Sequence, residues 1–249
     1  MSPEASKEII ADLPAEIAVF PLTGVLLLPG GRLPLNIFEP RYLAMIDHAF
    51  RHGRLIGMVQ PRVANPADNH GDDLTLDDDE EIARIAAAAA AAETGRDEPP
   101  ALYDTGCVGK IVQFEETDDG RYIVVLEGLS RFRIEKELPL DPGGFRKVAV
   151  NWQEFGTDLA ETGQEIDRDR LIPSLQQFFE IHGLSADWEA IAETPDDRLV
   201  TTLCMICPFE PGEKQALLEA PDLASRVDVM QALIDMAVHE GDDVAAVRH

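Results

Sequence analysis

Basic residues are scarce in this chain. Its 249 residues include 21 lysines and arginines against 47 aspartates and glutamates, which gives a formal net charge of −26. Nonspecific attraction to nucleic-acid phosphates or to anionic membrane surfaces is therefore disfavoured. We expect neither a nucleic acid nor a membrane among the partners of this acidic protein.

Cysteines and long apolar runs are scarce as well. Three cysteines argue against a disulfide framework. The sequence has no run of about 18 uncharged apolar residues, the length that a membrane-spanning helix needs. The first residues, MSPEASKEIIADLP, have neither the basic region nor the apolar stretch of a signal peptide. We expect a cytoplasmic protein.

Catalytic signatures are missing too. There is no GxxxxGK[ST] and no GxSxG motif. The stretch GCVGK at 106–110 lacks the spacing of a P-loop and is followed by Ile111 instead of Ser or Thr. Carboxylates are so abundant that no pair stands out. The sequence therefore predicts no catalytic residues and no cofactor.

Two pairs have spacings that metal or redox sites also use. Cys204 and Cys207 form a CxxC pair, but they lie in an apolar helical stretch where cysteine behaves as a small buried hydrophobe. His48 and His52 have the i, i+4 spacing of a zinc-binding helix, yet Ala49 replaces the glutamate and no third ligand is evident. We interpret the first pair as core and the second as a solvated helix face, and predict no metal site.

What the chain does contain is a turn-rich apolar stretch at 19–42, VFPLTGVLLLPGGRLPLNIFEPRY. Its four prolines and three glycines exclude a simple helix. Val25–Leu28 is predicted as a short buried strand, and the alternation of Leu33, Leu35 and Ile37 indicates a partly buried edge strand. Helical spacing begins after Pro40, so a helix is predicted over 41–52 with Gly53 just past its end.

Further strands are predicted over 54–60, 107–114, 121–127, 131–135 and 148–152, with turn signals at 117–120 and 141–144. Strands in succession joined by short turns favour an antiparallel barrel or pseudo-barrel. Residues 62–100 interrupt them with an acidic insertion, which holds eleven acids between Asp68 and Glu98 and an alanine-rich helix signal at 77–94.

From about residue 165 the spacing of apolar residues becomes helical, and Gly183, Pro195, Pro211 and Pro221 mark helix boundaries. We therefore predict an α+β chain. Residues 1–16 are a lead-in, 17–155 form a β-rich pseudo-barrel that carries the insertion, and 156–249 form a helical bundle.

Three blocks of this sequence resemble the Lon N-terminal, or substrate-binding, domain family. They are the stretch at 19–42 followed by GMVQPR at 57–62, then GCVGKIVQFEETDDGRYIVVLEGLSRFRI at 106–134, then LCMICPFEPGEKQALLEAPDLASRVDVMQALI at 203–234. The resemblance implies a PUA-like pseudo-barrel followed by helices, and recognition of polypeptide substrates. The family's ATPase and Ser-Lys peptidase modules have no counterpart in these residues.

The resulting hypothesis is a noncatalytic, proteolysis-related module that binds unfolded or flexible polypeptide segments. We predict peptide contacts at Leu35, Ile37, Phe38 and Tyr42, which could line an apolar groove; core packing is the alternative role for the same residues. A second hypothesis is a regulatory adaptor for a folded partner such as a protease, tethered by the 77–94 helix. RNA binding would rest on the PUA-like fold alone, and the charge argues against it.

Overall fold

The computed structural model describes residues 13–62, 100–156, 158 and 165–247. The chain divides into two compact units, and we describe each by itself. The described parts of unit 1 are 13–62 and 100–158, and that of unit 2 is 165–247. The acidic insertion between residues 62 and 100, with its predicted helix at 77–94, lies outside the described residues.

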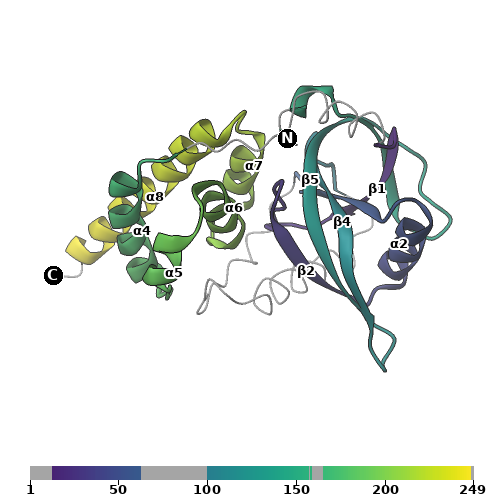
Figure 1. Cartoon of the computed structure of the whole chain (residues 1–249), viewed down its shortest axis with the longest axis horizontal. Helices are drawn as coiled ribbons and strands as arrows, with labels where there is room; N and C mark the ends of the chain where they lie inside the picture. Colours follow the sequence, from purple (N-terminus) through teal and green to yellow (C-terminus); the bar gives the residue numbers. More distant parts are fainter. Residues whose placement is uncertain (1–12, 63–99, 157, 159–164, 248–249) are drawn as a thin grey trace. The chain divides into compact units, whose positions relative to one another are not determined.

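Unit 1 is built from six strands (Figure 1). They are β1 (Glu16–Pro21), β2 (Arg32–Ile37), β3 (Leu55–Val59), β4 (Thr105–Glu116), β5 (Tyr122–Glu137) and β6 (Arg146–Asn151), accompanied by helix α2 (Pro40–Arg51) and the short 3-10 helix η1 (Gln153–Phe155). The strand order is β2-β5-β4-β3-β1-β6, and an additional β5–β6 pairing closes five of the strands into a ring. β2 stands outside this ring, on the edge of β5.

The predicted strands and helix boundaries agree closely with these elements. The 121–127 and 131–135 segments join into one long strand, β5, which pairs with β2 and β4 near its start and with β4 and β6 near its end. The pairing of β1 with β3 is parallel, so the sheet is mixed and not purely antiparallel. A parallel pair needs a long crossover, which β2 and α2 supply between these two strands. The predicted pseudo-barrel is confirmed.

One strand prediction is wrong. Val25–Leu28 are buried as expected, but they form no strand. This segment instead packs against β4 and β5: the Leu27 side chain lies beside Gly109 and Gly128, and the Leu28 carbonyl lies against Gly128. An apolar run in a buried strand and one in a buried irregular segment have the same sequence pattern, because both cover their side chains on all sides.

Gly128 allows this close approach. A Cβ atom at this position would lie 2.1 Å from the Leu28 carbonyl oxygen, and one at Gly109 would lie 2.8 Å from Leu27 Cδ2. The backbone of Gly128 also accepts a hydrogen bond from Gly30 N–H at 2.9 Å and donates one to the Gly31 carbonyl at 2.8 Å. The segment that precedes β2 is thus joined to β5 just where β2 begins.

A buried ion pair holds the end of unit 1 to the ring. The Arg131 guanidinium donates to both carboxylate oxygens of Asp158, with Nη2–Oδ1 at 2.6 Å and Nε–Oδ2 at 2.9 Å. Both side chains are almost fully buried. The guanidinium also lies 4.6 Å from the centre of the Phe155 ring, a cation–π contact. Arg131 therefore joins β5 to η1 and the residues that follow it.

Unit 2 is helical, as the sequence predicts. Its helices are α4 (Arg168–His182), α5 (Trp188–Glu193), α6 (Asp196–Ile206), α7 (Pro211–Glu219) and α8 (Leu223–Val247). α8 packs against α4, α6 and α7. Gly183 ends α4 with a φ of 66°, and Pro211 begins α7, which confirms both boundary signals. Within the described ranges, no helix combines the length and apolarity needed to cross a membrane.

The interior of unit 2 contains an ammonium group beside two thiols. Lys214 is buried, and its Nζ lies 3.4 Å from the Met205 carbonyl. Burial lowers the pKa of Lys214 from its ordinary 10.5 to about 8, although the nearby Cys207 and Cys204 oppose this shift. Burial also raises the pKa of Cys204 to about 12 and raises that of Cys207. The thiols therefore stay protonated near neutral pH, and the prediction that they belong to the core is confirmed.

Gly128→Ala tests the close approach of the Leu28 backbone to β5. The added methyl group would force the Leu28 backbone to move, so we expect the free energy of unfolding to fall by about 2–3 kcal/mol. Chemical denaturation followed by circular dichroism measures this. Gly212→Ala is the control, because a Cβ atom there has no neighbour within 4 Å; equal effects of the two substitutions would contradict the packing argument.

Lys214 makes a pH-dependent contribution to stability. Its pKa is lowered in the folded state, so between about pH 8 and 10.5 the unfolded chain holds a proton that the native protein lacks, and stability rises with pH. Between pH 7 and 10.5, we expect the wild type to gain about 3 kcal/mol relative to Lys214→Met. Urea unfolding at both pH values measures this. Lys136→Met, at an exposed lysine, is the control. A pH-independent difference in stability between the wild type and Lys214→Met would contradict the predicted contribution of Lys214.

Candidate functional site

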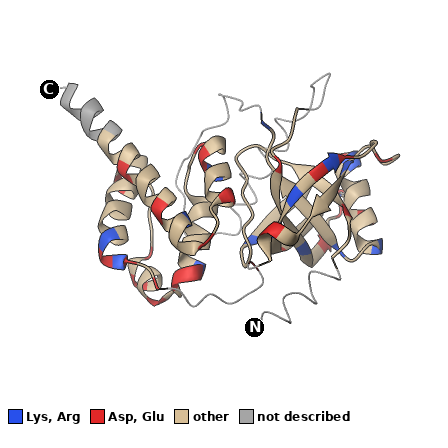
Figure 2. Ribbon diagram, turned by 90° about the horizontal axis from the view of Figure 1, so that it is seen from above, with Lys and Arg blue, Asp and Glu red and all other residues tan. Residues whose placement is uncertain are grey.

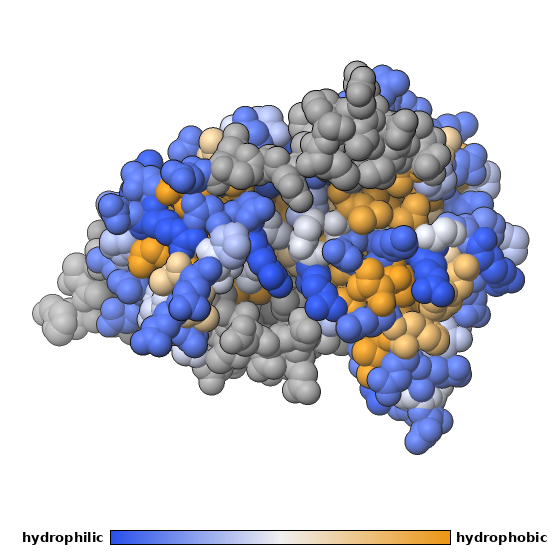
Figure 3. Space-filling view, viewed as in Figure 1, coloured by the Kyte–Doolittle hydropathy of each residue, from blue (hydrophilic) through white to orange (hydrophobic). Residues whose placement is uncertain are grey.

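The candidate site is an exposed apolar surface where β2 ends beside the β4–β5 hairpin. Most large apolar side chains of unit 1 are buried, but four near this hairpin are about 40% exposed. We call this set, Phe38, Val112, Phe114 and Ile123, the hairpin surface. Figure 3 shows apolar side chains over β4 and β5, interrupted by hydrophilic ones. Phe38 and Ile123 lie on one face of the hairpin and Phe114 on the other, and exposed apolar side chains gathered in this way are typical of interaction sites.

Strand register brings Phe38 and Ile123 to one face of the hairpin. Ile123 of β5 lies directly opposite Asn36 of β2. Phe38 is two residues beyond Asn36, so the alternation of side chains along the strand places it on the same face, diagonal to Ile123. The Asn36 side chain is half-buried, and its buried Oδ1 has no hydrogen-bond partner among the described residues.

The opposite face of the hairpin packs on α2 through aromatic rings. Phe114 makes edge contacts with Phe50 of α2 and with Tyr122 of β5, at centroid distances of 4.8 and 5.0 Å. The Tyr122 hydroxyl is 3.3 Å from Asp47 Oδ1. Burial and the carboxylates of Asp47 and Glu116 raise the pKa of Tyr122, so its hydroxyl remains protonated. These contacts support the hairpin from one side and leave the other side open.

The hairpin tip is acidic. Glu115, Glu116, Asp118 and Asp119 cluster there. Hydrogen bonds from Arg121 and Thr117 lower the pKa of Asp119 to about 2. In Figure 2, basic and acidic positions alternate along the strand ribbons of unit 1, and its described strands form no continuous basic face. The surface thus combines apolar side chains with negative charge, which suits a neutral or cationic partner.

The structure separates the four residues predicted to contact a peptide. Leu35, Ile37 and Tyr42 are at most 3% exposed, whereas Phe38 is 41% exposed. The Tyr42 ring stacks at a tilt on Phe20, with 4.2 Å between ring centres. Phe38 is the member of the set that a polypeptide could reach, and the other three hold β2 and α2 beneath it. Peptide contact at these residues stays a prediction.

The motif that follows Phe38 forms the start of α2. Glu39 is the residue before the helix, and Pro40 occupies its first turn. Glu39 Oε2 accepts a hydrogen bond from Arg41 Nε at 2.9 Å, and the Arg41 guanidinium lies over the Tyr42 ring at 4.4 Å. These contacts set the direction in which the chain turns from β2 into α2, and so they position Phe38.

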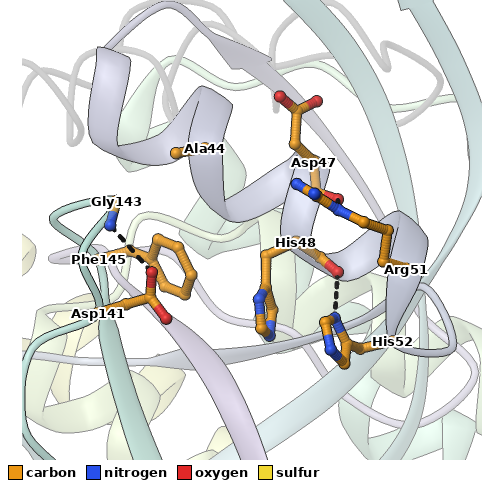
Figure 4. Close-up of a pocket in the computed structure, with 8 residues that line it drawn as sticks. All are labelled: Ala44, Asp47, His48, Arg51, His52, Asp141, Gly143 and Phe145. Atoms are coloured by element: carbon orange, nitrogen blue, oxygen red, sulfur yellow. Dashed lines mark hydrogen bonds between the residues drawn. The ribbon is translucent and has the colours of Figure 1, made fainter.

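A pocket lies between α2 and the turn before β6 (Figure 4). Its volume is about 380 Å³, and its lining is Ala44, Asp47, His48, Arg51, His52, Asp141, Gly143 and Phe145. His48 and His52 stack with 3.9 Å between ring centres, and His52 Nδ1 is 2.7 Å from the His48 carbonyl oxygen. Burial and the neighbouring His52 lower the pKa of His48. The half-buried His48 also packs against Phe145.

This pocket combines two histidines with the carboxylates of Asp47 and Asp141. Asp141 Oδ1 accepts a hydrogen bond from Gly143 N–H at 2.9 Å, so it stabilises its own turn. Among the described residues, no group of three or more His, Cys, Asp and Glu side chains is placed to hold a metal ion. The hairpin surface is therefore the stronger candidate.

Sequence reasoning missed Val112, Phe114 and Ile123. All three lie in stretches that were predicted as strands, but their exposure follows from where the ring ends. β4 is largely buried up to Ile111 and exposed from Val112 to Glu116. The turn signal at 117–120 placed this part of the strand near a hairpin tip. A hairpin that extends beyond a barrel has few partners to cover its faces, and the 117–120 turn was therefore the signal for exposure.

The fold has a counterpart among solved structures. The crystal structure of a Lon N-terminal domain protein from Xanthomonas campestris superimposes with a TM-score of 0.54 at 19% sequence identity. The superposition covers 88% of this chain and 98% of that one. At this identity the likeness concerns the fold.

Sequence relatives extend the comparison. Lon protease 2 of Myxococcus xanthus is 25% identical over 231 residues, which cover 90% of this chain and 24% of that protein. The Lon protease of Escherichia coli (strain K12) is 24% identical over 243 residues, covering 96% of this chain and 26% of that protein. The chain thus spans about a quarter of the length of these relatives. The family model of the ATP-dependent protease La (LON) substrate-binding domain matches residues 16–235, and the chain belongs to this family.

Proposed function

We propose that this chain is a noncatalytic module that binds unfolded or flexible segments of polypeptides in the cytoplasm. The observation that supports it most directly is the hairpin surface, an exposed group of large apolar side chains on an otherwise well-packed ring. Phe38, one of its four members, belongs to the sequence block at 19–42. Membership of a substrate-binding domain family supports the same role.

The shape of the surface favours a flexible ligand. Phe38 and Ile123 are each 41% exposed on one face of the β2–β5 pair. Apolar side chains of an unfolded segment would lose water against them, with a gain of about 25 cal/mol for each Å² of apolar area buried. A folded protein has few such side chains available, so this surface selects for unfolded chains.

The charge of the protein refines the choice of ligand. The acidic tip residues would repel acidic segments and attract those that carry lysine or arginine near their apolar residues. Part of the affinity should therefore decrease as salt is added, whereas the apolar part should remain.

Ribonuclease A provides a direct test, because it is basic and can be studied folded or after reduction and iodoacetamide alkylation. We expect fluorescence anisotropy to detect binding of the unfolded form and little binding of the folded form. The double variant Phe38→Ala/Ile123→Ala should bind the unfolded form about tenfold to a hundredfold more weakly, since two exposed apolar contacts are removed.

Leu140→Ala is the matched control, because Leu140 is 63% exposed but lies outside the hairpin surface. It should bind like the wild type, and thermal unfolding should show that all variants remain folded. Equal binding of folded and unfolded ribonuclease A would mean simple charge attraction and would refute the proposal. Equal losses in the double variant and in Leu140→Ala would refute the assignment to the hairpin surface.

A further inference from the structure

β2 is an edge strand. It pairs with β5 on one side, and among the described residues no strand pairs with its other side. Unpaired strand edges present backbone donors and acceptors that can bind an additional strand. Arg32 and Phe38 are exposed at the two ends of this edge, Asn36 is half-buried and Pro34 is buried, so the edge is accessible at its ends.

The register shows which backbone groups point outward. Gly128 N–H donates a hydrogen bond to the Gly31 carbonyl, so Gly31 and Gly128 form a hydrogen-bonded pair. Hydrogen-bonded and non-hydrogen-bonded pairs alternate along an antiparallel ladder. The backbone groups of every second residue therefore also bond to β5, namely those of Leu33, Leu35 and Ile37. The residues between them turn their backbone groups away from β5. Those residues are Arg32, Pro34 and Asn36.

Pro34 supports this orientation independently. Proline has no N–H, so it is tolerated in a strand where that position does not face the neighbouring strand. Pro34 lies opposite Val125 in a pair that does not exchange hydrogen bonds, which leaves the missing donor on the outer edge. The outer edge therefore presents the N–H groups of Arg32 and Asn36 and the carbonyls of Arg32, Pro34 and Asn36.

An unsatisfied side-chain acceptor lies at the same edge. Asn36 Oδ1 is buried and has no hydrogen-bond partner among the described residues. A buried acceptor without a donor costs about 1–3 kcal/mol, so a bound group that supplied an N–H would recover part of this energy. Asn36 faces outward beside Ile123 and precedes Phe38 by two residues, which makes the strand edge continuous with the hairpin surface.

We propose that an extended segment of a bound polypeptide adds to the outer edge of β2 as a further strand. Its backbone would exchange hydrogen bonds with Arg32, Pro34 and Asn36, and its apolar side chains would contact Phe38 and Ile123. The inference rests on the proposed polypeptide binding and specifies how that binding occurs. Affinity would then come largely from the backbone, which suits ligands that share little sequence.

Asn36→Pro tests the backbone contact. It removes one outward N–H and leaves every hydrogen bond to β5 in place, while Asn36→Ala removes the side chain and keeps the N–H. With unfolded, alkylated ribonuclease A as the probe, we expect Asn36→Pro to bind about tenfold more weakly than Asn36→Ala. Equal affinities of two folded variants would overturn the strand-addition proposal and leave the proposed polypeptide binding intact.

Hydrogen exchange of the wild-type protein gives a second measurement that does not depend on how the proline variant folds. The amides of Arg32 and Asn36 should exchange at least about tenfold more slowly when unfolded ribonuclease A is bound. The amides of Leu33 and Leu35, already bonded to β5, serve as internal references. Binding without added protection at Arg32 and Asn36 would refute strand addition, and an absence of any binding would refute it together with the proposed function.

Discussion

The contact between the Leu28 carbonyl and Gly128 is the constraint on which unit 1 depends. The segment at 25–28 packs closely against β5, and it can do so because position 128 has no side chain. The adjoining hydrogen bonds of Gly30 and Gly31 then set the start of β2 against β5. A shift of one residue here would exchange the inward and outward side chains of β2, because their period is two.

The candidate site follows from that register. With Leu33, Leu35 and Ile37 turned into the core, Asn36 and Phe38 are left on the outside, beside Ile123. The same register directs the backbone of Pro34 and Asn36 away from β5. The packing of residues 28–31 against Gly128 therefore sets both the apolar side chains and the backbone groups that β2 presents at its edge.

The two units handle buried charge differently. In unit 1, Arg131 is neutralised by the carboxylate of Asp158 through short hydrogen bonds. In unit 2, Lys214 lies near two protonated thiols, and burial lowers its pKa to about 8. A charge paired with a carboxylate remains ionised in the interior, whereas removal from water moves a buried ammonium group toward its neutral form.

Local chemistry in the sequence was enough to determine most of the secondary elements, because prolines, glycines and residue spacing act within a few positions. The α2 boundaries, the 117–120 turn and the helix ends at Gly183 and Pro211 were all predicted in this way. Tertiary structure decided the rest. Whether Val25–Leu28 paired as a strand, and whether Leu35 or Phe38 faced solvent, depended on residues about a hundred positions away in β5. Apolar residues carry no local sign of which partner will cover them, so the 117–120 turn indicated where the hairpin ends but not which of its side chains are exposed.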